Sequence, residues 1–157
     1  MRKIQSLLTC LLISLLLLSG CALNESSSRV YLETTPYDTI NNLDGVNMKI
    51  SGEVSPTALT IVMENNSDKN CLYGDYFRLE KKIEGRWYQI PVAIDGNYGF
   101  NDIGYDLPSG EVSEWEVDWE WLYGSLEPGE YRIIKDVLEF KDTGDYDTYY
   151  LAVEFSI

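Results

Sequence analysis

The sequence has 157 residues, with 26 acidic and 12 basic side chains, a net charge of −14 and no histidine. This charge excludes nucleic-acid partners, which are bound through lysine and arginine contacts to phosphates. The missing histidine excludes imidazole acid–base catalysis, His-based triads and histidine zinc sites, and we expect no cofactor. A hydrophobic content of 45% and an aromatic content of 13% predict one folded domain.

The first twenty residues have the pattern of a secretory signal. Positively charged Met1-Arg2-Lys3 is followed by an apolar run that ends in Leu18-Ser19-Gly20-Cys21, which resembles a bacterial lipobox. A transmembrane anchor is the alternative, but polar residues interrupt the run, which lies at the lower limit of about 17–25 residues for a span. We therefore predict a cleaved signal peptide at residues 1–20 and a lipidated Cys21. Lipid would hold the protein on the extracytoplasmic face of the cell membrane.

The remaining cysteines indicate that the mature domain has no disulfide. Cys10 leaves with the signal peptide and Cys21 is alkylated, so Cys71 is the one free thiol. A catalytic thiol needs an electropositive partner, and without histidine we interpret Cys71 as a small hydrophobic residue.

Residues 21–44 are predicted to form a flexible tether between the lipid and the domain. Asn24 to Ser28 is polar and lacks periodicity, and Asn41 to Gly45 is rich in turn residues. Val30-Tyr31-Leu32 is the exception, with the composition of a short strand.

From Val46 onward, short alternating segments predict strands separated by turns. Apolar residues alternate with more polar ones over 59–64 and again over 77–83. Glu84-Gly85 then separates the second segment from residues 86–90, as in a two-residue hairpin with glycine at a positive φ.

The clearest alternation lies between residues 114 and 120. Trp115 and Trp119 share one face with Val117, and the other face carries only carboxylates, among them Glu114, Glu116 and Asp118. This pattern predicts a half-buried antiparallel strand, with both tryptophans in the core. A last strand is expected at 149–157, and residues 121–125 suit a single helical turn.

About seven short strands separated by turns predict an all-β, Ig-like antiparallel sandwich at residues 45–157. Leu126 to Ile133 resembles the tyrosine corner of such sandwiches, in which Tyr131 would hydrogen-bond to upstream backbone. A Pro-Gly turn before an ordinary strand is the alternative.

Four segments together resemble the bacterial Ig-like domain of small Gram-positive cell-surface lipoproteins. They are Leu59 to Asn66, Tyr73-Gly74, Glu80-Lys81-Lys82 with Gly85-Arg86-Trp87-Tyr88, and Trp119 to Ile133. The resemblance implies the fold and a surface location over Val46 to Ile157. It implies no catalytic residues.

Two loops contain candidate binding residues. Asp142, Asp145 and Asp147 could supply oxygen ligands to calcium, although the spacing is not that of an EF-hand and a hairpin turn also explains them. Tyr98 and Phe100, in the loop from Asp95 to Asp102, could stack on sugars or enter a partner's pocket. The alternative is that both rings fold back over the open end of the sandwich.

These observations predict a lipid-anchored, non-enzymatic surface module that binds or scaffolds at the bacterial cell envelope. Its partners would be the membrane, through the lipid, and an envelope protein or glycan. Two alternatives remain open: a proteinase inhibitor acting through residues 95–102, and a calcium- or carbohydrate-binding accessory module. The fold alone does not separate these functions.

Overall fold

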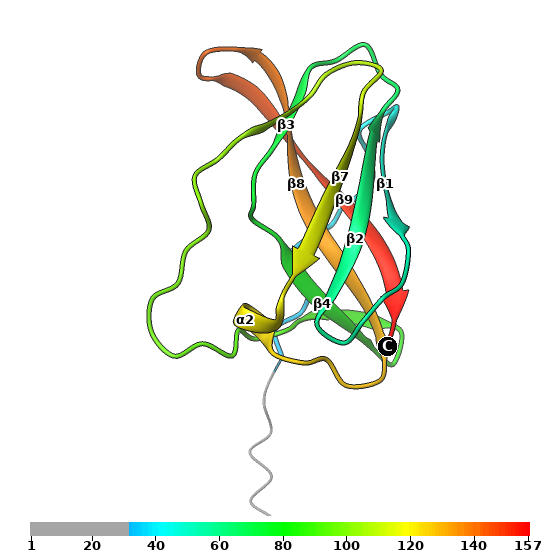
Figure 1. Ribbon diagram of the computed structural model, residues 1–157, viewed down its shortest axis with the longest axis vertical. Coiled ribbons are helices and arrows are strands. Elements are labelled where there is room, and N and C mark those ends of the chain that lie inside the picture. Colours follow the sequence, from blue (N-terminus) through cyan, green and yellow to red (C-terminus); the bar gives the residue numbers. More distant parts are fainter. Residues whose placement is uncertain (1–31) are drawn as a thin grey trace, which may run out of the picture. The chain divides into compact units, whose positions relative to one another are not determined.

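A computed structural model describes residues 32–157, which form nine strands and one short helix (Figure 1). The predicted signal peptide and Cys21 lie outside these residues. The elements are β1 (Val46–Ser51), β2 (Ala58–Asn65), β3 (Cys71–Tyr73), β4 (Arg78–Ile83), β5 (Arg86–Gln89), β6 (Tyr105–Leu107), β7 (Val112–Asp118), α2 (Glu120–Tyr123), β8 (Glu130–Asp142) and β9 (Asp145–Ser156).

The strands form two antiparallel sheets that pack face to face. The smaller sheet has the order β1-β2-β7, and the larger one has the order β5-β4-β8-β3-β6, with β9 on the other side of β8. The prediction of an all-β antiparallel sandwich is confirmed. The structure has nine strands where about seven were expected. Strands β3 and β6 have only three residues each, which is too few to show an alternating pattern.

Alternation builds the core on the smaller sheet. On β7, Val117 is buried and Trp115 is half-buried, while Glu114 and Glu116 face solvent. Trp119, just after the strand, is 0% exposed, and its Nε1 donates to the carbonyl of Pro56 at 2.9 Å. The core-facing side chains of the smaller sheet pack against side chains of the larger sheet. For example, the ring centroids of Trp119 and Phe155 are 5.5 Å apart.

The connection into β8 forms a tyrosine corner. Tyr131 is buried and its hydroxyl donates to the carbonyl of Glu127 at 2.5 Å, four residues upstream. Its ring stacks on Phe155 of β9 with centroids 5.7 Å apart. The hydrogen bond and the stacking together fix the point where the chain enters β8.

The hairpin predicted at Glu84-Gly85 joins β4 to β5. Both residues have positive φ, 50° and 79°, and Ile83 pairs with Arg86 across the turn. This is the two-residue geometry that suits the twist of antiparallel strands.

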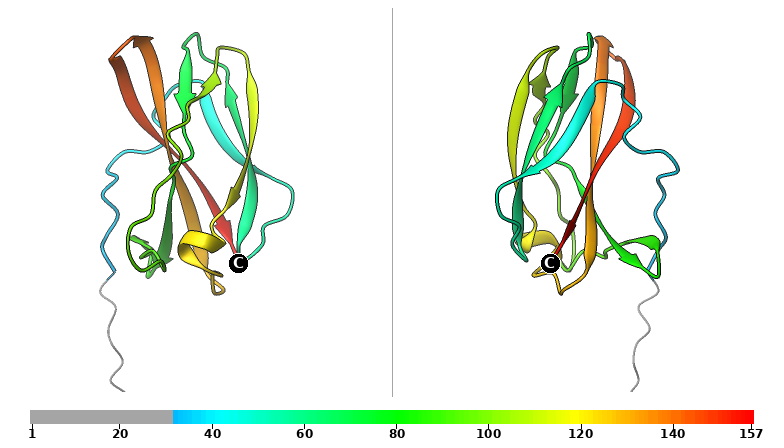
Figure 2. Two further views of the ribbon diagram at one scale, coloured as in Figure 1. Left: turned by 60° about the vertical axis from the view of Figure 1, so that its left-hand side comes forward. Right: turned by 90° about the vertical axis from the view of Figure 1, so that its right-hand side faces the viewer.

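Residues 33–43 differ from the predicted tether because they lie along the outer face of the larger sheet (Figure 2). We call this segment the strap. At one end Thr34 pairs with Tyr88 on the free edge of β5. At the other end the Asn41 side chain bonds both backbone groups of Ala152 on β9, at 2.8 and 3.1 Å. Only residues 21–32 of the predicted tether lie before the strap.

A buried ion pair lies beneath the strap. Arg132 of β8 donates to the Glu80 carboxylate of β4 at 2.6 Å and to the Thr35 hydroxyl at 3.1 Å, and it stacks on the Trp87 ring at 4.5 Å. Because the strap covers this face, β8 is buried on both sides from Tyr131 to Lys135 and shows no alternation there.

Candidate functional site

The loop from residue 90 to residue 104 joins β5 to β6 and contains both predicted binding aromatics. Its first part is held to the sandwich by hydrogen bonds from Ile90 N to Leu79 O at 3.0 Å and from Ala93 N to Leu122 O at 2.8 Å. Further along, Tyr98 is 46% exposed, whereas Phe100 is partly buried against the core. The structure therefore turns one predicted ring outward and the other inward.

Phe100 is the centre of an aromatic cluster. Its ring makes edge contacts with Tyr76 at 5.2 Å, with Phe77 at 5.5 Å and with Trp121 at 5.5 Å, and Tyr98 lies 6.5 Å away. These residues come from the loop, from the segment before β4 and from α2. Edge-to-face contacts at these distances are favourable and hold the loop in place.

A cleft of about 320 Å³ opens between this cluster and β7. Its aromatic side is formed by Phe77, Phe100, Trp115 and Trp121. Its polar side is formed by Asp75, Asn101, Glu116 and Asp118, with Gly99 and Val117 completing the lining. Among the described residues that line it, none is basic.

Several hydrogen bonds position the polar side of the cleft. Asn101 Nδ2 donates to Asp75 Oδ2 at 2.9 Å, which ties the loop to the segment before β4. Asp118 accepts from the Glu120 amide at 2.9 Å, and its carbonyl accepts from Trp121 Nε1 at 3.0 Å. Asp118 thus fixes the start of α2 and, with it, the orientation of the Trp121 ring.

Lys135 lies under the cleft and is 0% exposed. Its ammonium donates to the Tyr76 carbonyl and lies 4.9 Å from the centroid of the Trp115 ring. Burial lowers the pKa of Lys135, and the nearby Asp136 carboxylate, 3.4 Å away, partly opposes this shift. The buried cation therefore holds the backbone and one ring of the aromatic side from within.

A second cavity of about 220 Å³ lies on the other side of Phe100, between Tyr98 and β4. Tyr123 lines it, and burial raises the pKa of its hydroxyl to about 12. This hydroxyl stays protonated at neutral pH.

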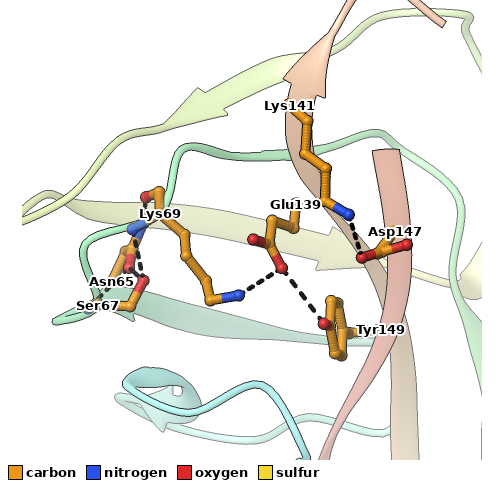
Figure 3. Close-up of polar contacts among 7 residues, drawn as sticks. All are labelled: Asn65, Ser67, Lys69, Glu139, Lys141, Asp147 and Tyr149. Carbon is orange, nitrogen blue, oxygen red and sulfur yellow. Dashed lines mark hydrogen bonds and ion pairs between the residues drawn. The ribbon is translucent and has the colours of Figure 1, made fainter. Parts of the chain in front are cut away.

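The carboxylates proposed for calcium lie on the β8–β9 hairpin and do not converge. Asp142 accepts from the Thr143 amide at 2.7 Å, and Asp147 pairs with Lys141 at 2.7 Å (Figure 3). Gly144 holds the two-residue turn at φ 77°. Within residues 32–157, no group of three Asp, Glu, Cys or His side chains is arranged to hold a metal ion.

Further down the same hairpin, Glu139 accepts from Lys69 at 2.5 Å and from the Tyr149 hydroxyl at 3.2 Å (Figure 3). The hydrogen bond from Lys69 holds the pKa of Glu139 below its ordinary value. Neighbouring Cys71 is buried, and burial raises the pKa of its thiol, the opposite of what a nucleophilic thiol needs.

The sequence pattern predicted Tyr98 and Phe100 as binding residues but gave no indication of Tyr76 and Trp121. Trp121 follows Trp119 by two residues, so strand periodicity would place both rings in the core. Because α2 begins at Glu120, Trp121 turns outward instead and is 44% exposed. The predicted helical turn at 121–125 contained the signal, but a turn does not specify which side chain it exposes.

Comparison with known families identifies one match. The family model of the bacterial Ig-like domain matches residues 42–156, which include both sheets and the aromatic cleft. Comparisons with curated proteins and with solved structures find no match. In the part of the chain that the structure describes, no helix has the length and apolar character to cross a membrane. The chain belongs to the bacterial Ig-like domain family.

Proposed function

We propose that the protein is a lipid-anchored binding module on the extracytoplasmic face of a bacterial membrane, and that its aromatic cleft binds a protein or glycan of the cell envelope. Membership of the bacterial Ig-like domain family suggests a non-enzymatic surface module. The Leu18-Ser19-Gly20-Cys21 sequence supports anchoring through Cys21.

The observation that carries the binding role is the exposure of large rings around a formed cleft. Trp121, which lines the cleft, is 44% exposed, and Tyr76 and Tyr98, which line the second cavity beside it, are 36% and 46% exposed, although all three lie next to a core that buries comparable side chains completely. Exposed aromatic residues that border a cavity are typical of ligand contacts, since they offer a large apolar area at a small cost in conformational entropy. The volume lies at the lower end of the range for ligand sites.

The inhibitor alternative is less well supported. An inhibitory loop must present a protruding segment to the protease, whereas residues 95–102, although mostly exposed, are tied to the sandwich in the middle by Phe100 and Asn101. A carbohydrate-binding module would use the same cleft, with rings for stacking and carboxylates for hydroxyl groups, and it falls within the proposal. Nothing in the described residues favours calcium binding.

Binding to isolated cell envelopes tests the proposal. The full-length protein, purified in detergent, is sedimented with increasing amounts of envelope material from the same cells. Trp121→Ala should weaken binding by about tenfold, as expected for a central aromatic contact, whereas Tyr98→Ala, which removes a ring of the second cavity, should weaken it less. Tyr146→Ala is the matched control, because Tyr146 is equally exposed but lies on the β8–β9 hairpin, outside the cleft. Equal binding by all three variants and the unmodified protein would refute a binding role for the cleft.

A further inference from the structure

One edge of β7 is open. In the sheet order β1-β2-β7 this strand is last, so it pairs with β2 on one side only. Its other side borders the cleft, which is lined by four consecutive residues, Trp115 to Asp118. The cleft therefore exposes the backbone of an unpaired strand as well as side chains.

The direction of the β7 backbone groups follows from the hydrogen bonds at the two ends of its pairing with β2. Trp119 N donates to Thr57 O at 2.9 Å, and Glu111 O accepts from Asn65 N at 3.0 Å. Residues that bond across an antiparallel pair alternate along the strand, so the odd-numbered residues of β7 bond to β2. The amides and carbonyls of Glu114 and Glu116 therefore point to the open edge. Within residues 32–157, no backbone group bonds to them there.

The side chains beside this edge define what could pair with it. Glu114, Glu116 and Asp118 form a row on the outer face of β7, and Asp75 adds a fourth carboxylate across the cleft. The inner face offers the rings of the aromatic cluster. A complementary strand would carry basic side chains outward, opposite the carboxylates, and apolar side chains inward, toward the rings. A second copy of β7 does not meet this requirement, because it would place carboxylates opposite carboxylates.

We propose that the cleft binds an extended, basic peptide segment of a cell-envelope protein, which adds to the β1-β2-β7 sheet as a fourth strand along the open edge of β7. The proposal rests on the proposed function of the cleft and names its ligand. Main-chain hydrogen bonds to Glu114 and Glu116 hold the segment, and about five of its residues span the distance from Glu114 to Asp118 at ~3.4 Å per residue.

A synthetic peptide tests the pairing directly. The probe is a capped heptapeptide of alternating lysine and valine, titrated into the full-length protein in detergent and followed by tryptophan fluorescence. It should bind, and the same peptide with glutamate in place of lysine should not. On binding, amide hydrogen exchange at Glu114 and Glu116 should slow by about tenfold or more, whereas Trp115 and Val117, which already bond to β2, should change little.

Backbone methylation distinguishes strand pairing from simple charge attraction. N-methyl groups on the set of alternate peptide nitrogens that faces β7 should weaken binding by about tenfold, and methyl groups on the other set by less than about twofold. On the protein side, Glu116→Pro removes one amide from the open edge, where proline is tolerated, while Glu116→Gln keeps the amide and removes the charge. The proline variant should lose about tenfold in affinity and the glutamine variant less.

Each outcome bears on the proposal. Absence of peptide binding, or equal effects of the two methylation patterns, overturns strand addition, and the methylated peptides decide this even if Glu116→Pro fails to fold. Binding to protein-free envelope glycan that is lost in Trp121→Ala, without peptide binding, would leave the cleft as a binding site and make its ligand a sugar. Envelope binding that survives Trp121→Ala would instead refute the proposed function itself.

Discussion

The Tyr131 hydroxyl links the turn before β8 to the strand through a single hydrogen bond to Glu127 O. Tyr131→Phe removes the donor and leaves the ring stacked on Phe155. The free energy of unfolding should fall by about 1–3 kcal/mol, because a partly buried carbonyl loses its partner. Chemical denaturation measures this change, and a value near zero would show that the corner contributes nothing to stability.

Trp119 and Glu116 belong to one short segment, but truncation should affect stability strongly at Trp119 and hardly at all at Glu116. Trp119→Ala empties a fully buried site and should cost about 3–5 kcal/mol. Glu116→Ala removes an exposed carboxylate from an acidic protein and should change stability by less than about 0.5 kcal/mol. Acrylamide quenching checks the burial independently: Trp119 should be shielded, and rapid quenching of this residue would contradict the observed register.

Lys135 should make stability depend on pH in a definite direction. Burial lowers its pKa below the ordinary value of 10.5, so between the lowered value and 10.5 the unfolded chain binds a proton that the folded chain does not. Its contribution to the free energy of unfolding therefore rises with pH through this window. Lys135→Met removes the titrating group. The free energy of unfolding of the unmodified protein minus that of the variant should increase as pH approaches 10.5. A decrease would contradict the burial of a charged amine. Tyr37 and Tyr123, whose pKa values burial raises to about 12, are present in both proteins and cancel in the difference.

At the scale of elements, the strap is held at β9 by the Asn41 side chain, by a hydrogen bond of 2.7 Å from Asn41 N to Tyr150 O and by contact between the Tyr37 and Tyr150 rings. Asn41 has a φ of 55°. Its side-chain amide bonds both the N–H and the carbonyl of Ala152, as the backbone of a neighbouring strand would do. Asn41→Ala should cost about 1–3 kcal/mol for the lost hydrogen bonds, with additional backbone strain. Asn41→Gly loses the same bonds without the strain, so it should be the milder change. Asn42→Ala is the control, with an effect within about 0.5 kcal/mol. Faster amide exchange at Ala152 in both Asn41 variants, but not in Asn42→Ala, would locate the effect.

The predictability of each strand depended on how many of its faces are covered. The alternation at 114–120 predicted β7 correctly because only one face of that strand meets the core. In β8 the strap covers the second face, so a continuous buried run replaces alternation, and the sequence contained no sign of the covering segment. The sequence of residues 33–43 shows no alternation of polar and apolar residues, because most of its hydrogen bonds join single groups to backbone that is distant in the sequence. Such bonds depend on tertiary position, which a local pattern does not contain.

The cleft was less accessible to sequence reasoning than the strands. Its lining comes from residues 75 and 77, 99–101, 115–118 and 121, and no local pattern shows that these segments meet. Of its aromatic residues, Phe100 was predicted to bind, together with Tyr98 of the second cavity, because both rings lie in a loop. The acidic row on β7 was recognised as a solvated face, but its position at an open sheet edge required the topology.

At the scale of the whole molecule, the proposed lipid anchor predicts that Cys21 keeps the sandwich at the membrane. Cys21→Ser should abolish incorporation of a labelled fatty acid and release the protein from the membrane fraction. We expect this loss because, in the proposed anchor, the Cys21 thiol is the group that receives the lipid. Metabolic labelling followed by fractionation measures both effects, with Cys10→Ser as the matched control that should keep label and location. Label that persists on the Cys21→Ser protein would refute lipidation at this position.

The strap also determines how the molecule would respond to mechanical load. A pulling force that enters at Leu32 first loads the short pairing of residues 33–35 with β5. It then loads the contacts of Asn41 with β9, and only after these the hydrogen bonds between the strands of either sheet. These bonds lie at the start of the load path and can open one after another, while β8 and β9 stay paired along their whole length. Released residues 33–42, which precede the core residue Leu43, would add roughly 33–36 Å of slack. The protein could thus extend under tension and refold onto its own sheet without exposing its core.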